Sequence, residues 1–506
     1  MREDRRMVLK SIGAVAAASV VGAAAGTATR PATAARMLPE ERRWITLLGT
    51  SLTKEHDYTA KVEGRIPEGL KGTLYRNGPG LFERGGVRKH HLLDGDGMIQ
   101  AFDFLDGKVR YRNRFVQTKK YREEAAAERY RYSTWSTLAP GGMWSNLGGA
   151  GTSQAGVTTL VKDGRLLAFD EINPPYALDP ATLATQGSFA VEPGKPSFDY
   201  KAHTKTDGRT GDWALFGTEY GRAMHVHHLI RGADGRVKAS GRIKAPRSTY
   251  LHDFFVTERH VVFVLNPIEF SPLAMLLGVR SFIDSLRWNR AQGNLVIVAD
   301  KNGKEPPLML EAPASFMWHS LNAYERGSTI VAEFVGYAEP DHFIGDDPDF
   351  KAVMQGREGN AKHPGLLRRY LIDLAGKAIR EETIASGHHE FPMVDARVQC
   401  HESRFAHLSY QTGRGWYHDG LARVDMKTGR RETFGFGPKH FVGEPIFAPS
   451  GSAEGQGWLL AQTLSGDTGK SFLAIFDARK IDAGPVAKVM LDHHVPFSFH
   501  GYWQAA

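Results

Sequence analysis

The stretch TTLVKDGRLLAFDE, residues 158–171, shows the pattern that decides the fold of this chain. Two short apolar runs flank Asp163-Gly164, and residues of this kind tolerate the positive φ angles that a tight hairpin turn requires. The same pattern recurs around Asp106-Gly107, Asp234-Gly235 and Asn302-Gly303. These stretches predict a chain built largely of antiparallel hairpins.

The hairpins are spaced some tens of residues apart along 506 residues, without a clean sequence repeat. The 55 glycines and 25 prolines also favour a turn-rich chain over a helical one. We therefore expect an all-β body of four-stranded sheets, a β-propeller, and the alternative is a stack of sandwich domains. No shift in composition marks a linker, so residues 35–506 are predicted to form a single domain.

Two segments are predicted to be helical. Residues 119–130 are rich in charged helix formers, and residues 272–288 are apolar on one side. The second segment either packs on the propeller face or forms an apolar lip at a tunnel mouth, a surface that could dip into membrane lipid.

Charge and cysteine content exclude several classes of function. The net charge of +8 is spread along the chain without a long basic run, which argues against nucleic-acid binding. The single cysteine, Cys400, excludes an internal disulfide and a cysteine-based metal cluster. Any metal site must therefore use histidine or carboxylate ligands.

Residues 1–34 have the three zones of an export signal. A basic start precedes an apolar stretch from Ile12 to Ala25, and a small-residue A-x-A site ends at Ala34. The pair Arg5-Arg6 resembles a twin-arginine signal, which serves proteins that fold before export. We expect a mature protein that begins near Ala35 and is exported, to the periplasm.

Four of the 21 histidines lie alone within apolar or aromatic stretches: His203, His252, His319 and His500. A buried imidazole needs a polar partner, and four of them on innermost strands would converge on the propeller axis. The adjacent pairs at 90–91, 388–389 and 493–494 are poorer metal ligands, since neighbours on a strand face opposite sides. From the residues alone, a shared metal and separate structural roles both remain open.

Nine ordered stretches decide between them, because together they resemble the carotenoid cleavage oxygenase family from about residue 40 to the end. They are GTLYRNGPG (72–80), HHLLDGDGMIQAF (90–102), GRLLAFDEINPPYALDPATLATQG (164–187), KAHTKTDGRTGDWALFG (201–217), YLHDFFVTERHVVF (250–263), FMWHSLNAYE (316–325), HEFPMVDA (389–396), GEPIFAP (443–449) and FSFHGYW (497–503).

The resemblance implies a seven-bladed β-propeller with a small helical dome over the active-site face. It implies a non-haem Fe(II) held by His203, His252, His319 and His500. It also implies three glutamates, Glu171, Glu390 and Glu444, each accepting a hydrogen bond from a ligand imidazole. One histidine has no such partner in the family, and the sequence does not identify it.

The chemistry of these residues agrees with that expectation. Imidazole is a good ligand for Fe(II), and four neutral ligands leave the centre at +2 with room for O2. A carboxylate behind a ligand histidine fixes its tautomer and strengthens it as a donor. The family's reaction is O2-dependent cleavage of an alkene double bond into two carbonyl products. The chain shows no serine–histidine–aspartate signature or phosphate loop.

Five aromatic residues close to the ligand histidines are expected to line a substrate tunnel: Phe254, Phe316, Trp318, Phe499 and Tyr502. Along a regular strand, a residue two positions from a ligand shares its face, and a residue one position away faces the blade interior. By that rule Phe254 is a better lining residue than Trp318 or Phe499. The alternative is that these rings pack between blades.

The expected substrate is a hydrophobic polyene, a carotenoid or apocarotenoid. The alternative is an aromatic alkene, a stilbene or lignin-derived phenylpropene, which related enzymes hold with a tyrosine and a lysine. Lys119, Lys120 and Tyr121 are weak matches for that pair. An isomerohydrolase and a non-catalytic exported binding propeller are further alternatives. Asp94 and Asp96 are interpreted as turn residues and not as a calcium loop.

Overall fold

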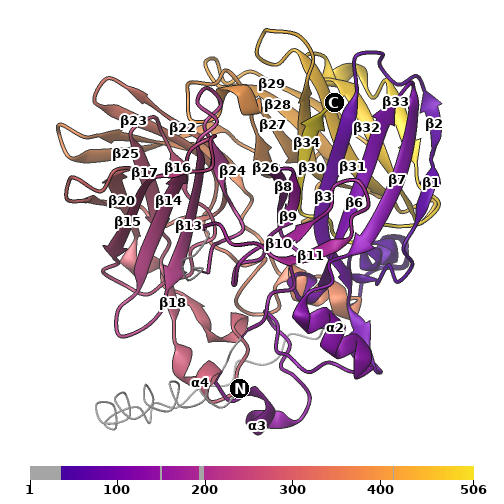
Figure 1. The fold of residues 1–506 in the computed structure, drawn as a ribbon, viewed down its shortest axis with the longest axis horizontal. Helices are drawn as coiled ribbons and strands as arrows, with labels where there is room; N and C mark the ends of the chain where they lie inside the picture. Colours follow the sequence, from indigo (N-terminus) through magenta and orange to yellow (C-terminus); the bar gives the residue numbers. More distant parts are fainter. Residues whose placement is uncertain (1–35, 149–150, 193–198, 414) are drawn as a thin grey trace.

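The computed structural model describes residues 36–148, 151–192, 199–413 and 415–506. The predicted export signal, residues 1–34, lies outside these described residues. Most of the described chain forms seven sheets of four or five antiparallel strands, which are the blades of a β-propeller (Figure 1). The predicted all-β, seven-bladed fold is confirmed.

We number the blades along the chain and name the strands of each from the axis outward. Blade 1 consists of β34 (His500–Ala505), β3 (Gly72–Leu81), β6 (Asp96–Leu105), β7 (Lys108–Phe115) and β1 (Asp57–Thr59). Blade 2 consists of β8 (Thr159–Lys162), β9 (Arg165–Ala168), β10 (Tyr176–Leu178) and β11 (Thr185–Ser188). Blade 3 consists of β12 (Lys205–Thr206), β13 (Trp213–Glu219), β14 (His225–Arg231) and β15 (Val237–Lys244). Blade 4 consists of β16 (Phe255–Val256), β17 (His260–Leu265), β20 (Asn294–Asp300) and β21 (Leu308–Ala312).

The remaining blades come from the second half of the chain. Blade 5 consists of β22 (Phe316–Arg326), β23 (Thr329–Tyr337), β24 (Leu366–Asp373) and β25 (Ala378–Ala385). Blade 6 consists of β26 (His389–Met393), β27 (Phe405–Tyr410), β28 (Gly420–Asp425) and β29 (Arg431–Gly435). Blade 7 consists of β30 (His440–Pro449), β31 (Gly457–Ser465), β32 (Lys470–Asp477), β33 (Ala487–Met490) and β2 (Lys61–Gly64).

The predicted hairpin turns have the expected backbone geometry. Asp163 and Gly164, which join β8 to β9, have φ angles of 52° and 69°, and Asp106 and Gly107 have 50° and 73°. Two consecutive positive φ angles are typical of the type I′ turns that suit the twist of a hairpin. The Asp-Gly pairs therefore set the conformation of these two turns through their own residue types.

Strands from the two ends of the chain close the propeller. In blade 1 the last strand, β34, pairs with β3 from near the N-terminus, and in blade 7 β2 pairs with β33. Figure 1 shows these indigo and yellow strands side by side. A closed ring removes the open edge strands that would otherwise expose unpaired backbone groups. The C-terminal segment is therefore a central structural element.

Apolar contacts between neighbouring blades supply the core. Between blades 4 and 5, for example, Val264 and Val296 pack with Ile330 and Phe334, all fully buried. Burial of each such side chain contributes about 1.5–3 kcal/mol.

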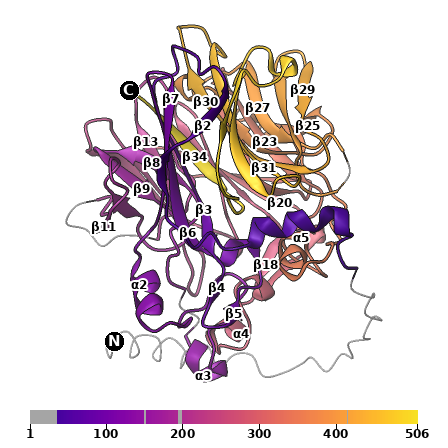
Figure 2. The ribbon, with the colours of Figure 1, turned by 90° about the vertical axis from the view of Figure 1, so that its right-hand side faces the viewer.

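Short helices lie on one side of the propeller, as the predicted dome requires (Figure 2). They are α2 (Lys119–Ala126), α3 (Gly142–Asn146), α4 (Pro272–Leu276) and α5 (Asp349–Ala352). The 3₁₀ segments are η1 (Glu40–Gly49), η2 (Leu92–Asp94), η3 (Ile283–Ser285), η4 (Arg290–Gln292), η5 (Val353–Gln355), η6 (Ala396–Val398) and η7 (Ile481–Ala483). The two-stranded sheets are β4 (Glu83–Arg84) with β5 (Val87–Arg88), and β18 (Ile268–Phe270) with β19 (Leu286–Trp288).

The prediction of one helix over residues 272–288 is wrong. The segment consists of α4, η3 and β19, because α4 ends before Gly278, which has a φ of 71° and packs against the backbone of Met143. The helix predicted over residues 119–130 forms over Lys119–Ala126 and ends there. Within the described residues, no helix is long and apolar enough to span a membrane.

Candidate metal centre and cavity

Four histidines from four blades meet near the propeller axis. His203 and His252 lie in the segments that lead into β12 and β16, His319 lies within β22, and His500 is the first residue of β34. All four are buried, and their ligand atoms lie within 4.8 Å of one another. The Nε2 atoms of His203 and His252 are 3.0 Å apart.

This spacing fits one metal ion. Two imidazole nitrogens bound at about 2.1 Å and at right angles lie about 3.0 Å apart. The Nε2 atom of His319 is buried and has no hydrogen-bond partner among the described residues, although a buried polar atom normally has one. The four imidazoles would therefore hold Fe(II), which supplies O2 activation when it is bound.

Three glutamates lie behind three of the histidines. Glu390 is 2.5 Å from Nδ1 of His319, and Glu444 is 2.9 Å from Nδ1 of His500. Glu171 is 3.0 Å from Nδ1 of His252. A carboxylate at Nδ1 places the hydrogen on that nitrogen and leaves the Nε2 lone pair for the metal.

Two features of this arrangement were not predicted from the sequence. No carboxylate partner of His203 is found among the described residues, so His203 is the ligand without a glutamate. The hydroxyl of Tyr250 lies 2.9 Å from Nδ1 of His252, so it shares that nitrogen with Glu171. Tyr250 stands two residues before His252 in the quoted YLHDFF stretch, which was the available signal.

The seven blades contribute one functional residue each. Blades 1, 3, 4 and 5 contribute the histidines, and the chain segments of blades 2, 6 and 7 contribute Glu171, Glu390 and Glu444. Glu171 lies in the connection between β9 and β10. In blade order the centre is thus surrounded by His500, Glu171, His203, His252, His319, Glu390 and Glu444.

Irregular strands aim several of these side chains. The register of β22 shifts on both sides of Ser320, that of β26 shifts between Glu390 and Met393, and that of β30 shifts between Val442 and Pro445. Phe391 has a φ of 52°. An extra residue in a strand bends it and re-aims its side chains. The prolines at 392 and 445 lie within these irregular segments.

The charges around the centre are nearly balanced. Burial by itself would raise the pKa of Glu171. The opposing effect of His252 and Lys201 is larger, so the pKa of Glu171 lies below its usual value. Burial is likewise outweighed at Glu390 by His319 and the Phe391 N–H, so its pKa is lowered. The three carboxylates carry −3, which Fe(II) and the Lys201 ammonium together offset. Such pairing is needed because a lone buried charge is very costly.

A second buried ion pair ties three blades together behind the ligands. Nζ of Lys205 lies 2.9 Å from Asp253, and Asp253 accepts hydrogen bonds from the backbone and hydroxyl of Ser320, both at 2.8 Å. Each of these residues is next to, or two positions from, a ligand histidine. The network therefore holds His203, His252 and His319 in register.

Arg76 of β3 anchors the C-terminal segment. Its guanidinium is fully buried and donates to the carbonyl of Glu444 at 2.9 Å, to Oγ of Ser498 at 3.2 Å and to the carbonyl of Phe499 at 3.3 Å. Burial lowers the pKa of Arg76 to about 10, so the group stays charged at neutral pH. These bonds place His500 against the centre.

An aromatic cavity opens onto the histidines. It holds about 640 Å³ of space between protein atoms, counting the part open to solvent. The lining residues are Leu93, Trp135, Val157, His252, Trp318, His319, Tyr337, His342, Phe350, Glu390, Phe391, Trp416, Tyr417, His418, Phe441, Phe497, Phe499 and His500. Three ligand histidines thus lie in the wall of one mainly apolar chamber.

Of the five predicted tunnel residues, Trp318 and Phe499 line this cavity. The preference for Phe254 was wrong: it is fully buried between blades, with its ring 4.6 Å from Phe216 and 5.9 Å from Phe263. His252 and Phe254 precede β16, so the alternation of a regular strand does not apply to them.

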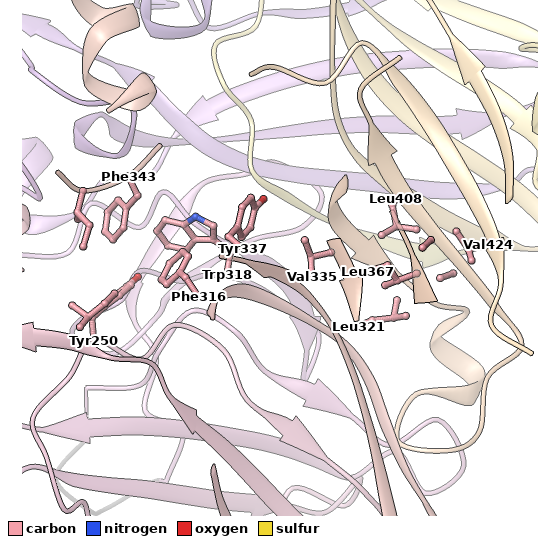
Figure 3. Packing of buried hydrophobic residues seen from close by; sticks show 14 of the residues in the cluster. Tyr250, Phe316, Trp318, Leu321, Val335, Tyr337, Phe343, Leu367, Leu408 and Val424 are labelled. Carbon is pink, nitrogen blue, oxygen red and sulfur yellow. The ribbon is translucent and has the colours of Figure 1, made fainter. Parts of the chain in front are cut away.

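Phe316 and Tyr502 do not line the cavity either. Phe316 packs behind the wall, 5.0 Å from Trp318 and 6.1 Å from Phe343 (Figure 3). Tyr502 packs with the apolar core between blades 1 and 2. Phe316 is three positions from His319, and residues an odd number apart face opposite sides of a regular strand.

The other singled-out motifs are structural. Asp94 accepts from the Thr137 hydroxyl at 2.7 Å, and Asp96 pairs with Lys120 at 2.6 Å. Lys120 also pairs with Glu124 and does not line the cavity, so it cannot hold a phenol there. His494 bonds to the carbonyl of Thr50 at 3.1 Å.

Comparisons with known proteins agree with the site. The family model described as retinal pigment epithelial membrane protein matches residues 49–505. The chain is 30% identical over 472 residues to an apocarotenoid-15,15'-oxygenase of Synechocystis sp., covering 90% of this chain and 94% of that protein. It is 28% identical over 480 residues to an isoeugenol monooxygenase of Pseudomonas nitroreducens, covering 90% and 96%. It is 28% identical over 471 residues to resveratrol cleavage oxygenase 1 of Aspergillus fumigatus, covering 88% and 91%.

Solved structures show the same similarity. The cobalt-substituted Synechocystis apocarotenoid oxygenase superposes with a TM-score of 0.86 at 29% identity, covering 92% of this chain and 99% of that chain. Fold, ligand set, carboxylate partners and family match point to one conclusion. The chain belongs to the retinal pigment epithelial membrane protein family of carotenoid cleavage oxygenases, and it is an enzyme that cleaves a carbon–carbon double bond with Fe(II) and O2.

Proposed function

We propose that the substrate is a carotenoid or apocarotenoid, cleaved at one double bond into two carbonyl products. The observation that carries this proposal is the aromatic cavity that opens onto the four histidines. A long polyene has an apolar surface and few polar groups, and such a chamber would bind it mainly through apolar contact. The double bond that lies beside the metal would be the one cleaved.

The cavity wall also bears on the alternative substrate. The described residues that line it include no lysine or arginine, whereas a phenolate would gain most from a cation. The buried Lys120 is already paired with Asp96 and Glu124. Cleavage of a stilbene or phenylpropene remains the second candidate, because two relatives at 28% identity are named for isoeugenol and resveratrol.

The test is product analysis. Purified, iron-loaded protein is supplied with O2 and, separately, with a series of apocarotenals and a series of stilbenes, and the products are identified by mass spectrometry. Cleavage of the polyenes into paired carbonyl fragments supports the proposal. Cleavage of stilbenes alone contradicts it. His319→Ala, which removes a ligand, and an anaerobic sample should both give no product.

We further propose that an exposed apolar patch near the dome contacts membrane lipid. We call it the α3–α4 patch, and its residues are Met143, Trp144, Leu147, Leu273, Leu277 and Val279. Trp144 is 78% exposed and Leu273 is 57% exposed. The two helices touch, since the Gly148 N–H donates to the carbonyl of Leu276 at 2.7 Å, and both views place them together at one end (Figures 1 and 2). Contiguous exposed apolar surface of this kind is typical of lipid or protein contact.

Sedimentation with phosphatidylcholine vesicles tests the lipid proposal. The double variant Trp144→Ser/Leu273→Ser should lose most vesicle binding, because each buried apolar side chain contributes about 1.5–3 kcal/mol. Leu105→Ser is the matched control, since Leu105 is 64% exposed at a different place, the β6–β7 turn. Equal binding by the double variant and the control would contradict the proposal.

We also propose export through the twin-arginine route, on the basis of Arg5-Arg6 and the apolar stretch that follows. Replacing both arginines with lysine should leave the protein in the cytoplasm of the producing bacterium, as measured by cell fractionation. Unchanged export of that variant would refute this route.

A further inference from the structure

Two buried histidines line the cavity without belonging to the metal centre. His342 lies in the loop after β23, and His418 lies in the loop before β28. The ring of His342 stacks on Trp416 at 4.5 Å, and the ring of His388 contacts both Trp416, at 4.3 Å, and His418, at 4.4 Å. The rings of His342, Trp416, His388 and His418 thus contact one another in a row, and His342, Trp416 and His418 line the cavity.

The tautomer of His342 follows from its partner. The indole N–H of Trp318 donates to Nε2 of His342 at 2.6 Å. Since an indole can only donate, Nε2 must be the acceptor, and in the neutral ring the hydrogen lies on Nδ1. That Nδ1 is buried and has no hydrogen-bond partner among the described residues. An unpaired buried donor is costly, so this N–H is suited to a ligand oxygen.

His418 presents a second unpaired atom, Nε2, in the same wall. Burial keeps the pKa of both histidines well below the usual value, so both rings are neutral at pH 7. Two neutral imidazoles with unpaired nitrogens in an apolar chamber suit a neutral oxygen and not a carboxylate, whose desolvation they would not offset.

Two neighbouring polar side chains, His388 and Tyr417, are already engaged in hydrogen bonds. Nε2 of His388 bonds to the carbonyl of Trp416 at 3.0 Å, and its Nδ1 accepts from the Gly365 N–H at 3.0 Å. The hydroxyl of Tyr417 donates to the carbonyl of Asp349 at 3.2 Å. The hydroxyl of Tyr337, by contrast, has no hydrogen-bond partner among the described residues, and burial together with the nearby Glu390 carboxylate raises its pKa.

Trp318 connects this polar wall to the metal centre. Its ring lies edge-on to His252, with centroids 4.7 Å apart, while its N–H holds His342. Figure 3 shows Trp318 between Phe343 and Tyr337, within the aromatic group of blade 5. A group bound at His342 is therefore held at a set separation from the ligand histidines.

We propose that His342 and His418 form an end-group site, which binds a neutral hydroxyl or carbonyl oxygen at one end of the substrate and so sets which double bond lies at the metal. This inference rests on the proposed function, because it assumes an alkene substrate. The two histidines would be the polar contacts that fix the position of the substrate along the apolar cavity.

The experiment measures binding apart from turnover. Iron-loaded protein is titrated without O2 with retinal, retinol and the methyl-ended hydrocarbon of the same skeleton, and quenching of the cavity tryptophans reports binding. The wild type should bind the two oxygen-bearing polyenes more tightly than the hydrocarbon, by about fivefold for each hydrogen bond. His342→Leu and His418→Phe should each remove most of that preference while the hydrocarbon still binds.

Two variants separate recognition from folding. His342→Gln should restore part of the preference, because its amide can accept from Trp318 and still donate to a ligand. His407→Phe is the matched control, since His407 is a buried histidine that stacks on Phe447 outside the cavity. It should keep the full preference.

The outcomes are distinct. A wild-type preference that survives in both His342→Leu and His418→Phe overturns the end-group site but leaves the proposed function intact. Failure of all three polyenes to bind to the wild type, whether or not stilbene and 4-hydroxystilbene bind, overturns the proposed function and with it this inference. With turnover restored, a shift in the mass of the products of His342→Leu from an apocarotenal would support the site directly.

Discussion

Replacing Glu444 with Gln tests whether the carboxylates tune the metal site or only fill space. The carboxylate accepts two hydrogen bonds, from Nδ1 of His500 at 2.9 Å and from the N–H of Gly501 at 2.7 Å. A glutamine has nearly the same volume but only one acceptor oxygen. In either orientation its NH2 group faces an N–H donor, so one of the two bonds must be lost.

The expected cost follows from these contacts. Losing a hydrogen bond to a buried charged group should destabilise the fold by about 1.5–3 kcal/mol. Losing the partner of a ligand imidazole should weaken metal binding by about 10- to 100-fold. Arg76 adds to the effect, because the charge of Glu444 opposes the lowering of its pKa by burial.

The assay is iron retention under competition with a chelator, read beside thermal unfolding. Glu325→Gln is the matched control: Glu325 also accepts from a histidine, His260, at 3.0 Å, but far from the cavity wall. It should lose stability and keep its iron affinity. If Glu444→Gln holds iron as tightly as the wild type while both variants lose stability equally, the supporting role of the carboxylate is refuted.

Three further outcomes are expected. Deleting residues 500–506 removes β34 and the ligand His500, so iron content and thermal stability should fall together, and a truncated protein that keeps its iron would contradict the closure described here. Burial lowers the pKa of His407 to about 4, against about 6.5 in the unfolded chain. Between pH 6.5 and pH 4 the unfolded chain binds a proton at this ring and the folded chain does not. The free energy of unfolding is therefore unaffected by this ring above pH 6.5 and falls by up to about 1.4 kcal/mol per pH unit towards pH 4. His407→Phe should therefore flatten the fall of Tm over that range, and an unchanged slope would count against the assignment. Phe254→Ala should lower the free energy of unfolding by about 3–5 kcal/mol, because it opens a cavity in the core, and should leave the cleaved bond unchanged. Trp318→Ala should instead alter the products. Chemical denaturation measures the first effect and mass spectrometry of the products measures the second.

Much of the fold was predictable because its signals are local. The Asp-Gly turns at 106–107 and 163–164 adopt the backbone angles that their residue types favour. The four ligands were also identifiable, since an isolated histidine in an apolar stretch needs a partner and the surrounding motifs match a family. The helix predicted over 272–288 failed because Gly278 ends α4 at a contact with Met143, which is distant in the chain.

The sequence predicted which residues form the metal site but not how the side chains around it are arranged. Strand alternation placed Phe254 on the wrong side because His252 reaches the axis from a segment outside the strand. It also missed the register shifts at Ser320 and Glu390, which re-aim the side chains of β22 and β26. Such shifts interrupt the period of two that an undisturbed strand shows in the sequence.

The sequence by itself therefore determined the hairpins and the propeller class, because turn chemistry acts locally, and its resemblance to a family indicated the seven residues of the centre. Only the tertiary structure decided which glutamate supports which histidine, that His203 has no carboxylate, and which rings form the cavity wall. These pairings are set by the closure of the ring, which brings β34 beside β3 and places one residue from each blade around a common axis.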